Sequence, residues 1–271
     1  MAMTELAQRG LVLLGCGRMG SAMLAGWLER GLPARAVWVL EPGPSEWLRG
    51  LEGIRLNAGL PDSPAAVLVA VKPQTMDEAL PALRHLGAGE TLFLSVAAGI
   101  PLGKYEAILG RKTPVVRAMP NTPAAIGRGI TALIGNGAVD ESRMQMAESL
   151  LSAVGEVVRL DSESQMDAVT AVSGSGPAYV FHLIETLAAA GTAEGLPADL
   201  AMRLARATVA GAGALAGTAD ESPEQLRINV TSPGGTTAAA LEVLMDAETG
   251  FPALLRRAVA AAAARSRELG G

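Results

Sequence analysis

Short apolar runs alternate with stretches of helical spacing over the first half of the chain. Continuous Val, Leu and Ala runs are typical of strands buried on both faces of a parallel sheet. Strands that alternate with helices place those helices on the two faces of the sheet, so the first half predicts an α/β fold. The expected strands are 10–15, 36–41, 66–71, 91–96, 115–119 and 131–136, and the expected helices are 18–30, 45–51 and 75–85.

The pattern changes near Asp161, where the strand signals stop. Ser162 and Gln165 have the spacing of a capping box, which marks the start of a helix. We therefore predict two domains, an α/β domain at 1–160 and an all-helical domain at 161–271. The expected helices of the second domain are 177–193, 197–217, 222–229, 236–246 and 251–269.

Several helices of the second domain are apolar on nearly every face, as in 180–190 and 205–216. A helix of this kind requires burial on all sides, which a domain of about 110 residues does not supply within one chain. We therefore predict that these helices pack between the subunits of a homo-oligomer.

Composition narrows the class of protein. Of the 271 residues, 49% are apolar and 18% are charged, which is typical of a compact folded chain. The net charge of -5 and the scattered Lys and Arg residues argue against a nucleic-acid partner. Apolar stretches are interrupted within about a dozen residues, too few to span a membrane. Cys16 is the one cysteine, so no intrachain disulfide forms and a cytoplasmic protein is expected.

A glycine-rich loop follows the first expected strand and opens the first expected helix. Gly15 permits a tight turn, Gly17 lets the backbone approach a pyrophosphate, and Gly20 lets helix and strand pack closely. The free N–H groups and the dipole of the helix N-terminus attract phosphates. A glycine-rich turn of another α/β fold is the alternative, but the strand–turn–helix context favours dinucleotide binding. The loop consists of Gly15, Cys16, Gly17, Arg18, Met19 and Gly20.

Glu41 ends the second expected strand, about 20 residues after Gly20. An acidic side chain at this position can accept hydrogen bonds from the adenosine ribose hydroxyls, and it would repel a 2′-phosphate. The alternative is a solvated carboxylate in a loop. On the first interpretation, NADH is accepted beside NADPH.

Three further runs, 71–74, 95–99 and 117–123, end expected strands at the sheet edge where α/β folds bind ligands. The small residues of the second run would let a flat nicotinamide ring lie against the backbone. Two prolines of the third run flank Asn121 and Thr122 and fix a rigid polar turn. Each run alone also fits an ordinary structural turn.

Two runs of the helical half carry candidate chemistry. The first, 167–181, is expected to join a helix end, a glycine turn and a helix started by Pro177. The second, 229–241, places glycines and hydroxyls around a helix N-terminus, where N–H groups and the dipole would hold a small carboxylate. Plain N-capping with a glycine turn is the alternative. The residues of this carboxylate cradle are Ser232, Gly234, Gly235, Thr236 and Thr237.

The two histidines, His85 and His182, lie outside these runs and are expected to be structural. The sequence shows no pattern of metal ligands and no Ser/His/Asp arrangement. The chemistry is therefore expected to need little acid–base help from side chains.

The chain resembles the pyrroline-5-carboxylate reductase family in these runs taken together. They occur in the family's order, and the most specific is Val-Thr-Ser-Pro-Gly-Gly-Thr-Thr at 230–237, with Ser-Gly-Ser-Gly-Pro-Ala-Tyr at 173–179. The resemblance implies a Rossmann-like NAD(P)-binding domain at 1–160 and a helical dimerisation and substrate-binding domain at 161–271. It also implies a homodimer, commonly assembled into a ring of dimers, a decamer.

The resemblance further implies a reaction and residue roles. The family reduces the cyclic imine 1-pyrroline-5-carboxylate to L-proline, the last step of proline biosynthesis. Thr237 matches the hydroxyl that faces the ring nitrogen, and the cradle comes from the partner subunit. Members often favour NADPH and carry small or basic residues after the second strand, so Glu41 is a departure. The residues assigned to NADP or NAD are the glycine-rich loop, Glu41, Ala70, Lys72, Pro73, Ala97, Ala98, Pro120 and Asn121.

Two other functions stay open at this point. A β-hydroxyacid dehydrogenase or a related reductase of the same build would need a Lys or His base in the helical half, and none is suitably placed. A dinucleotide-sensing protein without catalytic activity is the second alternative. Hydride transfer to a protonated imine needs mainly positioning, which fits a site without a catalytic histidine.

Overall fold

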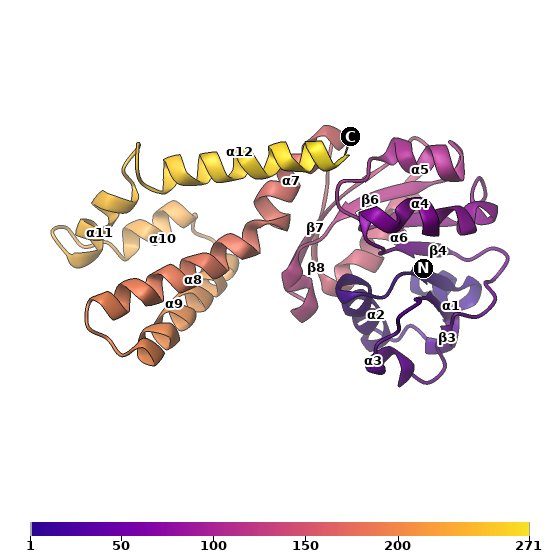
Figure 1. Ribbon diagram of the computed structural model, residues 1–271, viewed down its shortest axis with the longest axis horizontal. Helices are drawn as coiled ribbons and strands as arrows, with labels where there is room; N and C mark the ends of the chain where they lie inside the picture. Colours follow the sequence, from indigo (N-terminus) through magenta and orange to yellow (C-terminus); the bar gives the residue numbers. More distant parts are fainter. Residues whose placement is uncertain (1, 271) are drawn as a thin grey trace. The chain divides into compact units, whose positions relative to one another are not determined.

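The structure, a computed structural model, describes residues 2–270 and divides into two compact units (Figure 1). The sheet unit comprises Met1–Gly174 and Ala263–Gly271, and the helical unit comprises Ser175–Ala262. Among the described helices, none combines the length and the apolar character that a bilayer crossing requires.

The sheet unit is built on one eight-stranded sheet in the order β3-β2-β1-β4-β5-β6-β7-β8. Neighbouring strands run parallel except β6 and β7, which are antiparallel. The strand order reverses at β1, between β2 and β4, and open α/β sheets bind ligands at such a point. The strands are β1 (Leu11–Leu14), β2 (Val37–Leu40), β3 (Arg55–Leu56), β4 (Ala66–Val69), β5 (Leu92–Ser95), β6 (Val115–Met119), β7 (Gly129–Gly135) and β8 (Gly155–Arg159).

Helices pack on the sheet through apolar side chains that alternate between two core layers. Leu11 and Leu13 join the layer that contains Trp27, whereas Val12 joins the opposite layer. The Trp27 indole N–H donates to the Leu150 carbonyl oxygen at 2.7 Å, which ties α2 to α6. The α-helices of the sheet unit are α1 (Ala2–Arg9), α2 (Arg18–Glu29), α3 (Glu46–Arg49), α4 (Met76–Ala79), α5 (Leu102–Leu109), α6 (Glu141–Leu151) and α7 (Met166–Val169).

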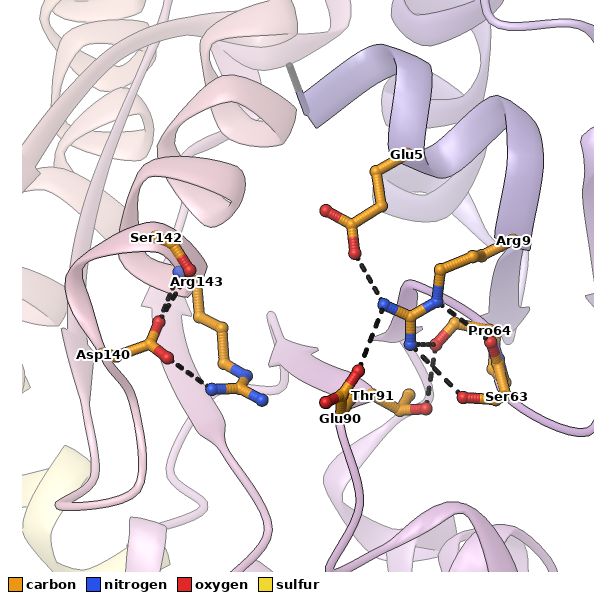
Figure 2. A network of polar contacts seen from close by, with 9 residues as sticks. All are labelled: Glu5, Arg9, Ser63, Pro64, Glu90, Thr91, Asp140, Ser142 and Arg143. Atoms are coloured by element: carbon orange, nitrogen blue, oxygen red, sulfur yellow. Dashed lines mark hydrogen bonds and ion pairs between the residues drawn. The ribbon is translucent and has the colours of Figure 1, made fainter.

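Arg9 ties α1 to the amino ends of β4 and β5 (Figure 2). Its guanidinium pairs with Glu5 at 2.6 Å and donates to the carbonyl oxygens of Ser63 and Pro64 at 3.3 and 3.4 Å. The Thr91 hydroxyl donates to the same Pro64 oxygen at 2.8 Å. These contacts lie at the sheet edge opposite the glycine-rich loop, which follows the carboxyl end of β1.

A cavity of about 700 Å³ opens beside this network. Arg9 and Arg143 both line it, and each already has a carboxylate partner, Arg143 being paired with Asp140 (Figure 2). Because the cavity adjoins Ala65 and Leu92 at the amino ends of β4 and β5, it is separate from the predicted dinucleotide edge.

The helical unit contains five helices, the last of which ends in the sheet unit. The long helices α8 and α9 pack on each other around Ala188, Ala201 and Ala205 (Figure 1). Large apolar side chains such as Phe181 and Val243 are exposed. The helices are α8 (Gly176–Ala193), α9 (Ala198–Thr218), α10 (Pro223–Asn229), α11 (Thr236–Leu244) and α12 (Phe251–Gly270).

The six predicted strands are present, and the unpredicted β3 and β8 extend the sheet at its two edges. The predicted parallel sheet is confirmed except at β7. Segment 120–128 is shorter than the dozen or so residues that a parallel crossover requires, so β7 runs antiparallel to β6. Helices α1, α5 and α6 are further elements that the apolar pattern does not predict.

The glycine turn predicted within 167–181 is also wrong. Helix α7 continues into a π-helical segment, Thr170–Gly174, and α8 begins after a bend at Ser175. Gly174 at the end of this segment lies beside the flexible methyl group of Met119. The capping box of Ser162 and Gln165 is confirmed.

Candidate active site

Two glycines of the glycine-rich loop, Gly15 and Gly20, lie where a side chain would not fit between β1 and α2. Gly15 has a φ of +89°, and a Cβ on it would lie 2.9 Å from the Ala70 carbonyl oxygen. A Cβ on Gly20 would lie 2.7 Å from the Gly15 carbonyl oxygen. Gly17 is the N-cap residue of α2, and a Cβ there would meet nothing within 4 Å, so the loop is open to a pyrophosphate. Of the other loop residues, Cys16 is buried, Arg18 is exposed and Met19 is half-buried.

The Glu41 carboxylate lies beside the glycine-rich loop. Its Oε2 accepts the Cys16 backbone N–H at 2.8 Å, and its Oε1 accepts the Gly43 N–H at 3.0 Å. The Asn57 side chain holds the Glu41 backbone, because it accepts the Glu41 N–H and donates to the Glu41 carbonyl, each at 2.9 Å. Burial, with Glu41 nearby, raises the pKa of the Cys16 thiol. Glu41 thus places negative charge at the dinucleotide edge.

The ends of β4 and β5 lie side by side because Val69 pairs with Ser95. In the turn after β5, Ala97 is buried and Ala98 is exposed, and Gly99 has a φ of +77°. Ala98 is thus the exposed residue of this turn, whereas Gly99 lies against Leu269 at the end of α12. The predicted residues at this edge are Ala70, Lys72, Pro73, Ala97 and Ala98.

A buried polar cluster joins β5, β6 and α5. The hydroxyls of Ser95 and Tyr105 are 2.5 Å apart. The Glu163 Oε1 accepts the Leu102 backbone N–H at 2.8 Å and pairs with Arg117 Nη1 at 2.7 Å. Burial raises the pKa of Tyr105 to about 12, so the phenol stays neutral at physiological pH.

Asn121 joins the turn after β6 to two other segments. Its Oδ1 accepts the Ile130 backbone N–H at 3.0 Å, and its Nδ2 donates to the Ser173 hydroxyl at 3.3 Å. The side chain makes no capping bond to the short 3-10 helix η4 (Thr122–Ile126) that it precedes. Together with the buried Pro120, it fixes the turn against the π-helical segment.

The cradle residues form one short segment of the helical unit. Gly234 has a φ of +68°, and Gly235 is the N-cap residue of α11. The Gly235 N–H donates to the Ser232 carbonyl oxygen at 3.0 Å, which closes the turn. Thr236 and Thr237 are the first two residues of α11, whose N-terminus has no side-chain cap and can receive an anion.

The predicted site residues thus fall into two groups. Those assigned to the cofactor meet at the carboxyl edge of the sheet, whereas the cradle residues lie in the helical unit. His85 bonds to the Ala82 carbonyl oxygen and His182 to Glu185, in keeping with structural roles. Tyr105 lies outside the runs predicted from the sequence, and its one signal there is a serine in an otherwise apolar strand.

The fold and this edge define a Rossmann-like dinucleotide-binding protein. Comparison with known families agrees with both halves. Residues 10–99 match the family described as NADP oxidoreductase, coenzyme F420-dependent, and residues 163–269 match the family described as pyrroline-5-carboxylate reductase dimerisation.

Relatives of known name extend the likeness over nearly the whole chain. The pyrroline-5-carboxylate reductase of Pseudomonas aeruginosa is 40% identical over 264 residues, which cover 96% of each chain. That of Synechocystis is also 40% identical, over 96% of this chain and 98% of its own. The structure of a pyrroline-5-carboxylate reductase from Coxiella burnetii has a TM-score of 0.90 at 33% identity, covering 97% and 99% of the two chains. The chain belongs to the pyrroline-5-carboxylate reductase family, as the sequence predicted.

A further solved structure bears on the cofactor edge. It is the Plasmodium falciparum pyrroline carboxylate reductase with NADP bound, which has a TM-score of 0.82 at 28% identity and covers 97% of this chain and 98% of its own.

Proposed function

We propose that this chain catalyses the NAD(P)H-dependent reduction of 1-pyrroline-5-carboxylate to L-proline. The observation that carries the proposal is the gathering of the glycine-rich loop and the turns after β4 and β5 at one sheet edge, in a member of this family. The reaction suits the candidate site, because a protonated imine is already electrophilic and needs mainly correct positioning.

The sheet edge is proposed to hold the dinucleotide. Gly15, Gly17 and Gly20 would receive the pyrophosphate, and Glu41 would face the adenosine ribose. The nicotinamide end would lie among the strand-end residues. When bound there, NAD(P)H supplies a hydride to the imine carbon of the substrate. The proposed contacts of the nicotinamide end are Ala70, Lys72, Pro73, Ala97, Ala98, Pro120 and Asn121.

The helical unit is proposed to hold the substrate. The N–H groups around Gly234 and Gly235 would bind the carboxylate, helped by the Ser232 hydroxyl and the dipole of α11. Thr236 stands beside them, and the Thr237 hydroxyl would orient the ring nitrogen, which keeps its proton as the imine becomes an amine. The hydride transfer itself therefore needs no proton transfer by a side chain.

We further propose a homodimer, assembled into a ring of dimers, in which each cradle serves the cofactor site of its partner. The exposed apolar faces of α8 and α9 and the match to a dimerisation family support this assembly. The functional division is proposed as a NAD(P)-binding domain at 1–160 and a dimerisation and substrate domain at 161–271. The free thiol of Cys16 suits an enzyme of the cytoplasm.

The test is an assay of the purified protein for oxidation of NADPH and of NADH with 1-pyrroline-5-carboxylate, with proline measured as the product. We expect stoichiometric proline with at least NADPH. A β-hydroxyacid panel, assayed for the reduction of NADP+ and of NAD+, serves as the control, because the same build hosts enzymes for such substrates. Folded protein that oxidises neither nucleotide with the imine would refute the proposal.

A further inference from the structure

In the turn after β5, the backbone N–H of Ala97 is bonded to a side chain and not to the neighbouring strand. The Val96 N–H still donates to the Val69 carbonyl oxygen at 3.0 Å, as a ladder bond of the parallel pair. The next N–H, that of Ala97, donates instead to the Ser95 hydroxyl at 3.2 Å. The path of the chain from β5 to Gly99 therefore depends on where the Ser95 side chain is held.

Tyr105 holds that side chain. Its hydroxyl lies 2.5 Å from Ser95 Oγ, and both residues are 0% exposed, so water does not compete for the bond. Tyr105 belongs to α5, whose first N–H, that of Leu102, is accepted by Glu163 at 2.8 Å. The phenol is thus carried by a helix that is itself anchored to another segment of the sheet unit.

We infer that Ser95 and Tyr105 are a positioning pair for the nicotinamide-binding turn. Neither side chain is required to touch the cofactor; the pair fixes the backbone of Ala97 and Ala98 against which the ring would lie. The neutral state of the phenol keeps this bond over the physiological pH range. The inference rests on the proposed nicotinamide placement. It implies that the two buried hydroxyls affect the binding of the nicotinamide end and not that of the adenosine end.

A purely structural hydroxyl on the same strand supplies the control. Thr91, just before β5, is 2% exposed and donates to the Pro64 carbonyl oxygen at 2.8 Å, at the amino end of the strand. Thr91→Val removes a buried hydroxyl of similar size, far along the strand from the turn. Its effect on stability should match that of Tyr105→Phe, which likewise removes one bond of a buried hydroxyl, and its effect on cofactor binding should be nil.

The experiment compares Ser95→Ala, Tyr105→Phe and Thr91→Val by titration calorimetry with NADPH and with 2′-phospho-ADP-ribose, which lacks the nicotinamide ring. We expect the Kd for NADPH to rise roughly three- to tenfold in Tyr105→Phe, and more in Ser95→Ala, which loses both bonds. The Kd for the fragment should stay at the wild-type value. Steady-state kinetics should show a raised KM for NADPH and an unchanged KM for the imine.

Two results would overturn the inference: an unchanged Kd for NADPH in both variants, or equal weakening of NADPH and of the fragment. If Ser95→Ala does not fold, Tyr105→Phe decides alone, because it keeps the volume of the ring. Failure of the proposed function looks different, since wild-type protein would then bind NADPH without reducing the imine.

Discussion

The two units of the chain differ in how far their large apolar side chains are buried. In the sheet unit, Trp27, Phe93 and Tyr105 are fully buried between the sheet and its helices. In the helical unit, Phe181 is 58% exposed and Leu204 is 49% exposed, although both lie in long, regular helices. The sheet unit exposes some large apolar side chains as well, such as Ile126 at 78% and Val172 at 62%, but most of its apolar side chains form a core within one chain. The helical unit instead leaves many of the large side chains of its long helices exposed.

This difference supports the proposal that the helical unit packs against another subunit. Its core cluster consists of three alanines, Ala188, Ala201 and Ala205, where α8 and α9 meet. Alanine allows the two helices to approach closely, but it buries little apolar area. The larger side chains, among them Phe181 and Leu204, are exposed, and exposed apolar surface of this kind is typical of a protein interface. A second copy of the chain is the partner that the dimerisation family implies.

The largest expected effect comes from a charge placed in this surface. We predict that Leu204→Glu makes the protein monomeric and removes activity. An unpaired charge in a buried interface costs roughly 3–5 kcal/mol, which weakens dimerisation by at least about 100-fold. Light scattering gives the mass, and the imine assay gives the activity.

Val158 supplies the matched control for this prediction. It is 42% exposed on β8 of the sheet unit, so Val158→Glu adds the same charge at a similar exposure. We expect that variant to keep the mass and the activity of the wild type. An active monomer of Leu204→Glu at micromolar concentration would contradict the assignment of each cradle to the partner's site.

The next effect is a loss of activity with the imine that leaves NADPH binding unchanged, which distinguishes the proposed roles of the two units. Thr237→Val keeps the shape of the side chain and removes the hydroxyl that would bond the ring nitrogen. Losing such a bond to a charged group costs roughly 1.5–3 kcal/mol, so kcat/KM for the imine should fall about 10- to 150-fold. The Kd for NADPH should not change, because the dinucleotide is assigned to the sheet unit.

Ser232→Ala is the companion variant for Thr237→Val. The carboxylate that Ser232 would bind is charged equally in the ground and transition states, so this variant should raise KM and spare kcat. Wild-type kinetics for Thr237→Val would remove its hydroxyl from the mechanism and leave positioning alone.

The same contrast decides how much could be predicted from the sequence. Gly15, Gly17 and Gly20 were found because the loop, its strand and its helix are consecutive in the chain. Tyr105 was not found, because its partner Ser95 reaches it only through the packing of α5 against β5. Strand β8 could not be predicted, because it lies at a sheet edge and its residues are half-buried or exposed. It therefore lacks the continuous apolar run that marks central strands.

Glu41 shows which features of a single residue could be predicted from the sequence and which could not. Its place at the end of β2 followed from the spacing after the glycine-rich loop. Its bond to the Cys16 N–H and the clamp by Asn57 depend on the pairing of β1, β2 and β3, which no local pattern specifies. For Glu41, position could therefore be predicted, whereas its side-chain partners could not.

The smallest expected effect concerns the choice of cofactor in the sheet unit, and Glu41 carries it. We predict that NADH is used at an appreciable rate beside NADPH, and that Glu41→Ser shifts the preference toward NADPH. Two like charges 4 Å apart repel by about 1 kcal/mol in water and about 4 kcal/mol at an effective dielectric of 20. Because Glu41 is half-buried, a value near the lower end is appropriate, which gives a shift of roughly tenfold in the ratio of the two kcat/KM values.

The Glu41 carboxylate also accepts the N–H groups of Cys16 and Gly43, so Glu41→Ser loosens the loop as well as removing charge. Glu41→Gln separates the two effects, because its amide oxygen can keep one of these bonds while the charge is lost. If charge sets the preference, both variants shift the ratio by a similar factor. If loop geometry sets it, Glu41→Gln resembles the wild type. An unchanged ratio in both variants would mean that Glu41 does not face the ribose. The KM for the imine should stay constant throughout, since the substrate cradle belongs to the helical unit.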